Sequence, residues 1–64
     1  MTKEEIKRML QDAHKEELAD HDKYCDWSKE LMALGHDKCA AIMKDIAHEE
    51  ETHAMYIAHI IEKL

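Results

Sequence analysis

The sequence predicts an all-α protein built from one long antiparallel helical hairpin. Its 64 residues include one glycine and no proline, and 38% of them are charged. A chain with so few turn signals is typical of long helices. Apolar residues recur at intervals of three and four, which is the period of a helix with one apolar face. Because a chain this short rarely builds a self-sufficient core, we expect a disulfide, a metal or a second copy to complete it.

The first helix is expected over about residues 2–34. Thr2 and Glu5 are three residues apart and match a capping box, in which each side chain bonds the backbone N–H of the other residue at a helix start. Gly35 is the only glycine, and glycine favours the left-handed conformation that ends many helices. The helix is therefore expected to end just before it.

The second helix is expected over about residues 37–63, after a turn at about 35–37. Asp37 suits the N-cap position because its carboxylate can accept from free N–H groups of the first turn. Lys63 lies near the other end, where a positive charge interacts favourably with the helix dipole. The whole chain, residues 1–64, is then a single helical hairpin.

Steps of three and four residues select one stripe on each helix, and we expect both stripes to face the interior. The first stripe comprises Ile6, Leu10, Ala13, Glu17, Asp20, Tyr24, Trp27, Leu31 and Leu34. The second comprises Cys39, Met43, Ile46, Glu50, His53, Ile57, Ile60 and Leu64. Each stripe is apolar at both ends and polar in the middle. Because a buried carboxylate without a partner loses its hydration for nothing in return, we expect a compensating group, and a metal is the leading candidate.

Three residues of this polar layer have the side chains of metal ligands. Glu50 and His53 form Glu-x-x-His, and this spacing places both side chains on one helix face. Glu17 lies at a similar distance from the turn, so it can meet them from the facing helix. One hairpin is half of a four-helix bundle, and a two-fold related copy would supply four Glu and two His in total. We therefore expect a homodimer or a higher homo-oligomer.

The charges of the layer favour two metal ions per dimer. Glu17 and Glu50 from two chains carry four negative charges, which balance two divalent ions. Oxygen ligands with one imidazole per ion favour iron or manganese over structural zinc, which prefers Cys and His. We expect two Fe ions per dimer, with Mn or Zn as substitutes. Asp20 is either a further ligand or a hydrogen-bonding partner of the ligands.

The overall charge argues against some partners. Fifteen acidic residues against nine basic ones leave a formal charge of −6, which disfavours nucleic acid and anionic membrane surfaces. The amino terminus MTKEEIKRML has no apolar run, so we expect no signal peptide, no membrane span and a cytoplasmic location. Cys25 and Cys39 are expected to be buried or half-buried free thiols, with a bridge as the alternative. The remaining histidines are expected to be solvated rather than ligating, with a hydrogen-bonding role beside the ligands left open for His14 and His21, which flank Glu17 by about one turn.

Two segments resemble a known family. "EELADHDKY" and "HEEETHA" are similar to the paired metal-binding segments of rubrerythrin, in the ferritin-like superfamily. That family has a metal-bridging Glu followed seven residues later by Tyr, matched here by Glu17 and Tyr24. It also has Glu-x-x-His-Ala, matched by Glu50, His53 and Ala54. The role of Tyr24 is open between a hydrogen bond to a ligand and packing in the core.

The resemblance implies a ferritin-like four-helix bundle with a non-haem di-iron site. It implies an oxidoreductase that reduces peroxide, or dioxygen, in defence against oxidative stress. Glu17 would bridge the ions, Glu50 would bridge or chelate, and His53 would cap each iron, so these three are the expected catalytic residues. Asp20 occupies the place of an extra family carboxylate but is one carbon shorter.

Two departures from the family shape the expectation. A rubrerythrin chain contains both halves of its bundle, whereas this chain contains one half and must dimerise to make the site. Rubrerythrin also carries a rubredoxin-like centre held by four cysteines, and this sequence has two. The electron donor would therefore be a separate protein such as a rubredoxin.

Two other functions remain open from the sequence. The first is a ferritin-like ferroxidase or iron-handling protein, for which Fe(II) is a substrate that passes on. The second is a metal-free helical dimerisation module, in which the polar layer fixes the register of the helices. Metal analysis separates the second from the others, and the mass of the assembly helps to identify the first.

Overall fold

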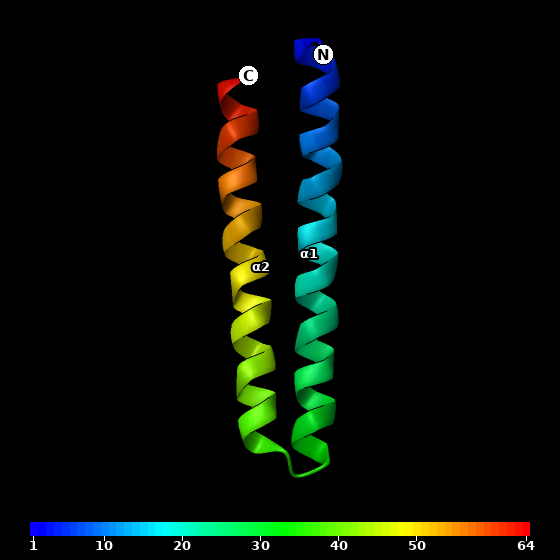
Figure 1. Cartoon of the computed structure of the whole chain (residues 1–64), viewed down its shortest axis with the longest axis vertical. Coiled ribbons are helices and arrows are strands. Elements are labelled where there is room, and N and C mark those ends of the chain that lie inside the picture. The colour runs from blue at the N-terminus through cyan, green and yellow to red at the C-terminus, as the bar shows by residue number, and fades with distance from the viewer.

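The computed structural model describes residues 1–64 as two antiparallel helices lying side by side (Figure 1). Helix α1 spans Lys3–Ala33 and helix α2 spans Asp37–Lys63. The turn lies at one end of a rod measuring 49 × 14 × 13 Å, and both termini lie at the other end (Figure 1). The predicted all-α helical hairpin is confirmed, and each helix lies within one residue of its expected limits. Neither helix contains a stretch long and apolar enough to cross a lipid bilayer.

The ends of α1 follow the predicted signals. The Thr2 hydroxyl accepts from the backbone N–H of Glu5 at 3.1 Å, and the Glu5 carboxylate accepts from the N–H of Thr2 at 3.3 Å. At the other end Gly35 adopts φ 82°, a left-handed conformation that a side chain disfavours. The N–H groups of Gly35 and His36 donate to the carbonyls of Met32 and Leu31. This pair of bonds is a Schellman motif, which satisfies carbonyls at the end of a helix.

The N-cap of α2 differs from the prediction by one residue. His36, not Asp37, is the N-cap, and its side chain makes no capping hydrogen bond. The His36 carbonyl accepts from the N–H of Ala40, so the helix begins directly after the Schellman motif. Asp37 becomes the first residue of α2, where its negative charge still faces the positive end of the helix dipole.

The seam between the helices is made of small side chains. Only Ser28, Ala40, Ala47 and Ala54 are buried. The three alanines are spaced by seven residues, so they form one row along α2 and let α1 approach closely. The Ser28 hydroxyl donates to the Ala40 carbonyl at 2.8 Å and ties the two helices together near the turn.

The side chains of the predicted stripes are half-buried or exposed within one hairpin, as expected for half of a bundle. Their large side chains lie beside the seam on one surface, which we call the open face. On this face Trp27 is 47% exposed, Leu34 72% and Ile60 46%. Two helices can bury only one seam, and the alanine row occupies it. The stripes therefore remain open to a further partner.

Candidate metal centre

Glu17, Glu50 and His53 come together halfway along the hairpin. One ligand atom from each side chain can be chosen so that all three lie within 4.8 Å of one another. His53 Nδ1 lies 3.6 Å from Glu17 Oε2, across the gap between α2 and α1. Glu17 is near the midpoint of α1 and Glu50 is at the midpoint of α2. The antiparallel arrangement therefore brings the three residues to one level.

One oxygen of this cluster makes no hydrogen bond within the chain. Glu17 Oε2 is shielded from solvent and makes no hydrogen bond, although the Glu17 side chain as a whole is 26% exposed. A buried carboxylate oxygen that has lost water without gaining a donor is costly. A cation at this oxygen would remove that cost. The orphaned oxygen distinguishes this cluster from ordinary surface acidic groups.

The electrostatics of the cluster also favour a bound cation. The pKa of the Glu50 carboxyl is raised above its ordinary value, chiefly because its protonated form hydrogen-bonds to Glu17. Desolvation and the negative charges of Glu17 and Asp20 raise it further, while His53 lowers it. Two carboxylates that share a small space repel each other when both are ionised. A metal ion would take the place of the proton between them.

The donor set fits a divalent first-row ion. Ligand atoms on one ion at about 2.1 Å can lie at most about 4.2 Å apart, so small side-chain rotations would bring these three into range. Two carboxylates and one imidazole match the oxygen-rich preference of iron and manganese. His53 is 52% exposed, so the site is accessible from the open face. One chain supplies three donors, which leaves coordination positions for further ligands.

Asp20 and Tyr24 are not part of the cluster. Asp20 Oδ1 lies 3.5 Å from Lys23 Nζ, and Asp20 is outside the three-residue group. Its role as a ligand stays a prediction. Tyr24 is half-buried and packs its ring against Trp27, with ring centroids 5.5 Å apart. That contact is the packing role that the sequence analysis left open.

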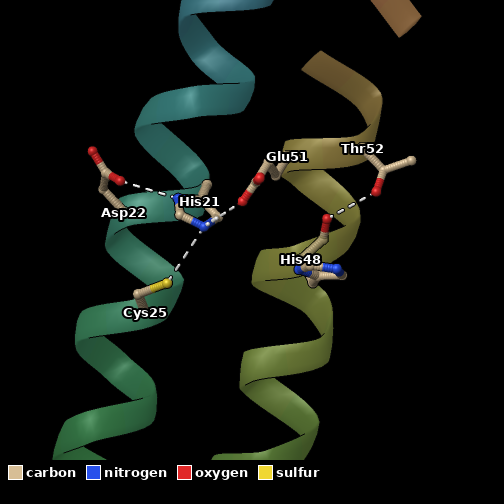
Figure 2. Close-up of polar contacts among 6 residues, drawn as sticks. All are labelled: His21, Asp22, Cys25, His48, Glu51 and Thr52. Carbon is tan, nitrogen blue, oxygen red and sulfur yellow. Dashed lines mark hydrogen bonds and ion pairs between the residues drawn. The ribbon is translucent and has the colours of Figure 1, made fainter. Parts of the chain in front are cut away.

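A second polar cluster was missed by the sequence analysis. His21 is half-buried, and its two ring nitrogens face Asp22 at 3.1 Å and Glu51 at 3.2 Å, with the Cys25 thiol at 3.7 Å (Figure 2). The sequence favoured a solvated His21 over a ligand, whereas the side chain is 26% exposed and hydrogen-bonded. His21 lies seven residues before Ser28 and so shares its side of α1, but only the structure identifies that side as the seam. Cys25 is half-buried, Cys39 is exposed, and both are free thiols, so only the expected burial of Cys39 was wrong.

The likeness to rubrerythrin rests on the quoted sequence segments alone. No protein-family model, no curated protein and no solved structure matches the chain.

Proposed function

We propose that the chain is a rubrerythrin-like di-iron protein that reduces peroxide, or dioxygen, at a site shared between two copies. The observation that carries this proposal is the orphaned, shielded Oε2 of Glu17 beside Glu50 and His53. A cation would satisfy that oxygen, and the matched rubrerythrin spacing favours iron. The two free thiols are in keeping with a reducing compartment such as the cytoplasm.

The second copy is part of the proposal because one hairpin supplies three donors. A two-fold axis would bring a second set of the same three groups to the centre, giving four carboxylates and two imidazoles. This is the donor set of di-iron and di-manganese carboxylate bundles. The apolar ends of the open face would pack against the same surfaces of the other copy and exclude water from the centre.

Each residue has a defined task at this centre. Glu17 and Glu50 would hold the ions through their carboxylates, and His53 would supply a nitrogen ligand. Because the pKa of Glu50 is raised, an entering ion would compete with a proton for this carboxylate, so binding would release protons wherever Glu50 is protonated. Two ferrous ions would supply the two electrons that a peroxide needs to become two molecules of water. A separate protein such as a rubredoxin would restore the electrons.

Iron content tests the proposal. The metal-free chain is loaded anaerobically with Fe(II), excess iron is removed by gel filtration, and iron per chain is measured with the solution mass. We expect one iron per chain in a dimer, and loss of iron in Glu17→Ala, Glu50→Ala and His53→Ala. The matched controls Glu62→Ala and His59→Ala, which change an acid and a histidine outside the cluster, should bind normally.

The outcomes separate the candidate functions. One peroxide consumed per two chains, with full oxidation of the iron, supports the proposed peroxide reduction. Continued uptake and oxidation of iron beyond one per chain would replace it with an iron-handling function. An iron-free dimer of unchanged stability would overturn it, and the polar layer would then be a device that fixes helix register.

A further inference from the structure

His21, Cys25 and Glu51 form a second cluster of side chains that can bind a metal, and the proposed function does not use them. The Nε2 atom of His21 lies 3.2 Å from Glu51 Oε2 across the seam, and 3.7 Å from the sulfur of Cys25 one turn along α1 (Figure 2). Glu50 and Glu51 lie three and four residues beyond Ala47, so the alanine row runs between them on the surface of α2. The second cluster therefore lies on the other side of the seam from the candidate metal centre.

The His21 ring is held so that Nε2 faces a carboxylate. Its Nδ1 atom lies 3.1 Å from Asp22 Oδ1, and a neutral ring that donates its one N–H to this carboxylate has only a lone pair at Nε2. That lone pair then faces the Glu51 oxygen with no proton between them, and a cation at Nε2 would remove the repulsion. Histidines that bind metals usually donate their other N–H to a carboxylate or carbonyl in this way.

The distances at Nε2 resemble those between the ligands of one tetrahedral zinc ion. With Zn–N and Zn–O of about 2.0 Å and Zn–S of about 2.3 Å, tetrahedral angles separate nitrogen from oxygen by about 3.3 Å and nitrogen from sulfur by about 3.5 Å. The observed separations of 3.2 Å and 3.7 Å are close to both. The three donors do not all lie within 4.8 Å of one another, as those of the candidate metal centre do, so one side chain must rotate to close the site. Glu51, whose side chain is 49% exposed, has the room to rotate.

The charges and the donor types of the cluster fit a divalent ion that accepts sulfur. The negative charges of Cys25 and Glu51 balance one such ion once the thiol has lost its proton. Sulfur and imidazole ligands favour zinc over magnesium, calcium and manganese. Cys25 also lines a groove of about 250 Å³ with Ser28, Lys29 and Lys44, which gives space for a water molecule as the fourth ligand.

We propose that His21, Cys25 and Glu51 form a second metal site, which binds zinc with one water molecule in the fourth position. His21 binds through Nε2, Cys25 as the thiolate and Glu51 through one carboxylate oxygen, while the thiol proton passes to solvent. Asp22 is a positioning residue that holds the His21 ring. The ion links α1 to α2 on the side of the seam opposite to the candidate metal centre. The two centres share no ligand, so this site does not depend on the proposed function.

Co²⁺ is the probe for this site, because it occupies tetrahedral zinc sites and its bond to a thiolate gives a charge-transfer band in the near ultraviolet. Metal-free Cys39→Ser protein, in which Cys25 is the only thiol, is titrated with Co²⁺ in the presence of a phosphine reductant. We expect a thiolate band that accounts for one Co²⁺ per chain and disappears when Zn²⁺ or EDTA is added. Co²⁺ at the candidate metal centre gives no such band, because the ligands there are Glu17, Glu50 and His53.

Substitutions within the cluster should have graded effects on this band. Cys25→Ser should abolish it, and His21→Ala should raise the Kd for Co²⁺ at least about 100-fold. Asp22→Asn should keep the band but raise the Kd about 10-fold, because the amide holds the His21 ring less firmly than the carboxylate does. Far-ultraviolet circular dichroism of each variant checks that the helices are retained. The matched controls, which change a histidine and an acid outside the cluster and should leave the Kd unchanged, are His59→Ala and Glu62→Ala.

Alkylation of Cys25 gives an independent readout with zinc itself. In the Cys39→Ser protein, saturating Zn²⁺ should slow the reaction of Cys25 with iodoacetamide about 10-fold or more, because the bound thiolate is no longer free to attack. His21→Ala should remove this protection. In Cys25→Ser, the exposed thiol of Cys39 should react at the same rate with and without Zn²⁺.

The outcomes separate this site from the proposed function. A thiolate band that persists in Glu50→Ala, in which we expect iron binding to be lost, would show that the two centres are independent. Absence of the band with Co²⁺ in large excess, or unchanged alkylation of Cys25 in saturating Zn²⁺, would overturn the second site whatever the iron content of the chain. His21 would then be an imidazolium that donates to both Asp22 and Glu51.

Discussion

The seam and the open face of the hairpin differ in the size of their side chains and in how far these are buried. The seam is complete within one chain, because the row of Ala40, Ala47 and Ala54 leaves at most 2% of each residue exposed. The open face holds the large side chains, such as Trp27 and Leu34, yet it leaves them substantially exposed. The seam thus sets the geometry of the hairpin, while most of the apolar surface lies elsewhere.

Under the proposed dimer, this difference would couple folding to assembly. Burying three alanine methyl groups stabilises by only about 2 kcal/mol, which is little against the entropy of ordering a chain of this length. The larger side chains, which are half-buried or exposed in one hairpin, would stabilise further if the open face were covered. The same face carries Glu17, Glu50 and His53, so covering it and completing the centre are one event. The following predictions test the two surfaces separately.

The largest effect is expected from a charge on the open face. Leu31 lines an apolar groove of about 330 Å³ with Trp27, Leu34 and Met43. Leu31→Glu loses about 2 kcal/mol of apolar burial in each copy and places an unpaired charge at the contact. We expect a Kd for dimerisation at least about 1,000-fold higher, measured by sedimentation velocity.

The neighbouring residue provides the control for this change. Met32 is 56% exposed and lines a groove on the opposite face with Lys29 and Lys44. Met32→Glu should leave the Kd within about 3-fold of the original, since the charge stays in water. An unchanged Kd in Leu31→Glu would show that the open face is not the interface.

The next largest effect is expected from overfilling the seam. Ala47 is 1% exposed, so Ala47→Leu must push the helices apart and should cost about 2–3 kcal/mol per chain in urea denaturation. Ala41 lies on the exposed surface of α2, and Ala41→Leu should change stability by less than about 0.5 kcal/mol. Equal losses in both variants would mean that the alanine row does not limit the helix separation.

A third effect concerns pH and metal removal at the centre. The pKa of Glu50 is raised in the folded chain, so the folded state holds this proton more tightly than the unfolded state. The metal-free protein therefore loses stability as pH rises from about 4.5, the ordinary value for Glu, through the raised pKa. We expect Glu50→Gln to be more stable than the metal-free wild type at pH 7, with the difference vanishing near pH 4 in Tm measurements.

The same substitution should reverse its effect once metal is present. Fe(II) should raise the Tm of the wild type, with an effect that grows with pH as the Glu50 proton is displaced. Adding EDTA should abolish that gain. Glu50→Gln should show no metal-dependent shift, because an amide cannot replace a bridging carboxylate. A metal-dependent rise in Tm that survives in Glu50→Gln would place the ion elsewhere.

The smallest effect is expected at the polar contact of the seam. The buried Ser28 hydroxyl bonds the Ala40 carbonyl across the helices, so Ser28→Ala should cost about 1 kcal/mol in thermal denaturation. Thr52 also donates to a carbonyl, that of His48 one turn earlier in the same helix (Figure 2). Thr52→Ala should be neutral or slightly stabilising, because alanine is the better helix former. Similar losses of stability in Ser28→Ala and Thr52→Ala would mean that the hydrogen bond across the seam stabilises no more than the bond within α2.

Much of the fold followed from local signals. Thr2, Glu5 and Gly35 end α1 where expected, because capping and a positive φ depend on a few neighbouring residues. The N-cap of α2 is His36 rather than Asp37. His36 is also the last residue of the Schellman motif, so the helix begins directly after the turn. The meeting of Glu17 with Glu50 and His53 also followed, since helix rise and an antiparallel turn fix their levels.

What the sequence by itself determined was the helix period, the helix ends and the level of the three ligand residues, because each depends on spacing along the chain. Only the tertiary structure decided which row the two helices bury. Periodicity marks the large apolar side chains, but close approach of two helices selects the smallest row, the alanines with Ser28. The position of His21 beside Glu51 followed from that choice, as did the exposure of the open face. A pattern read along one helix cannot reveal them, because they depend on which faces the two helices turn toward each other.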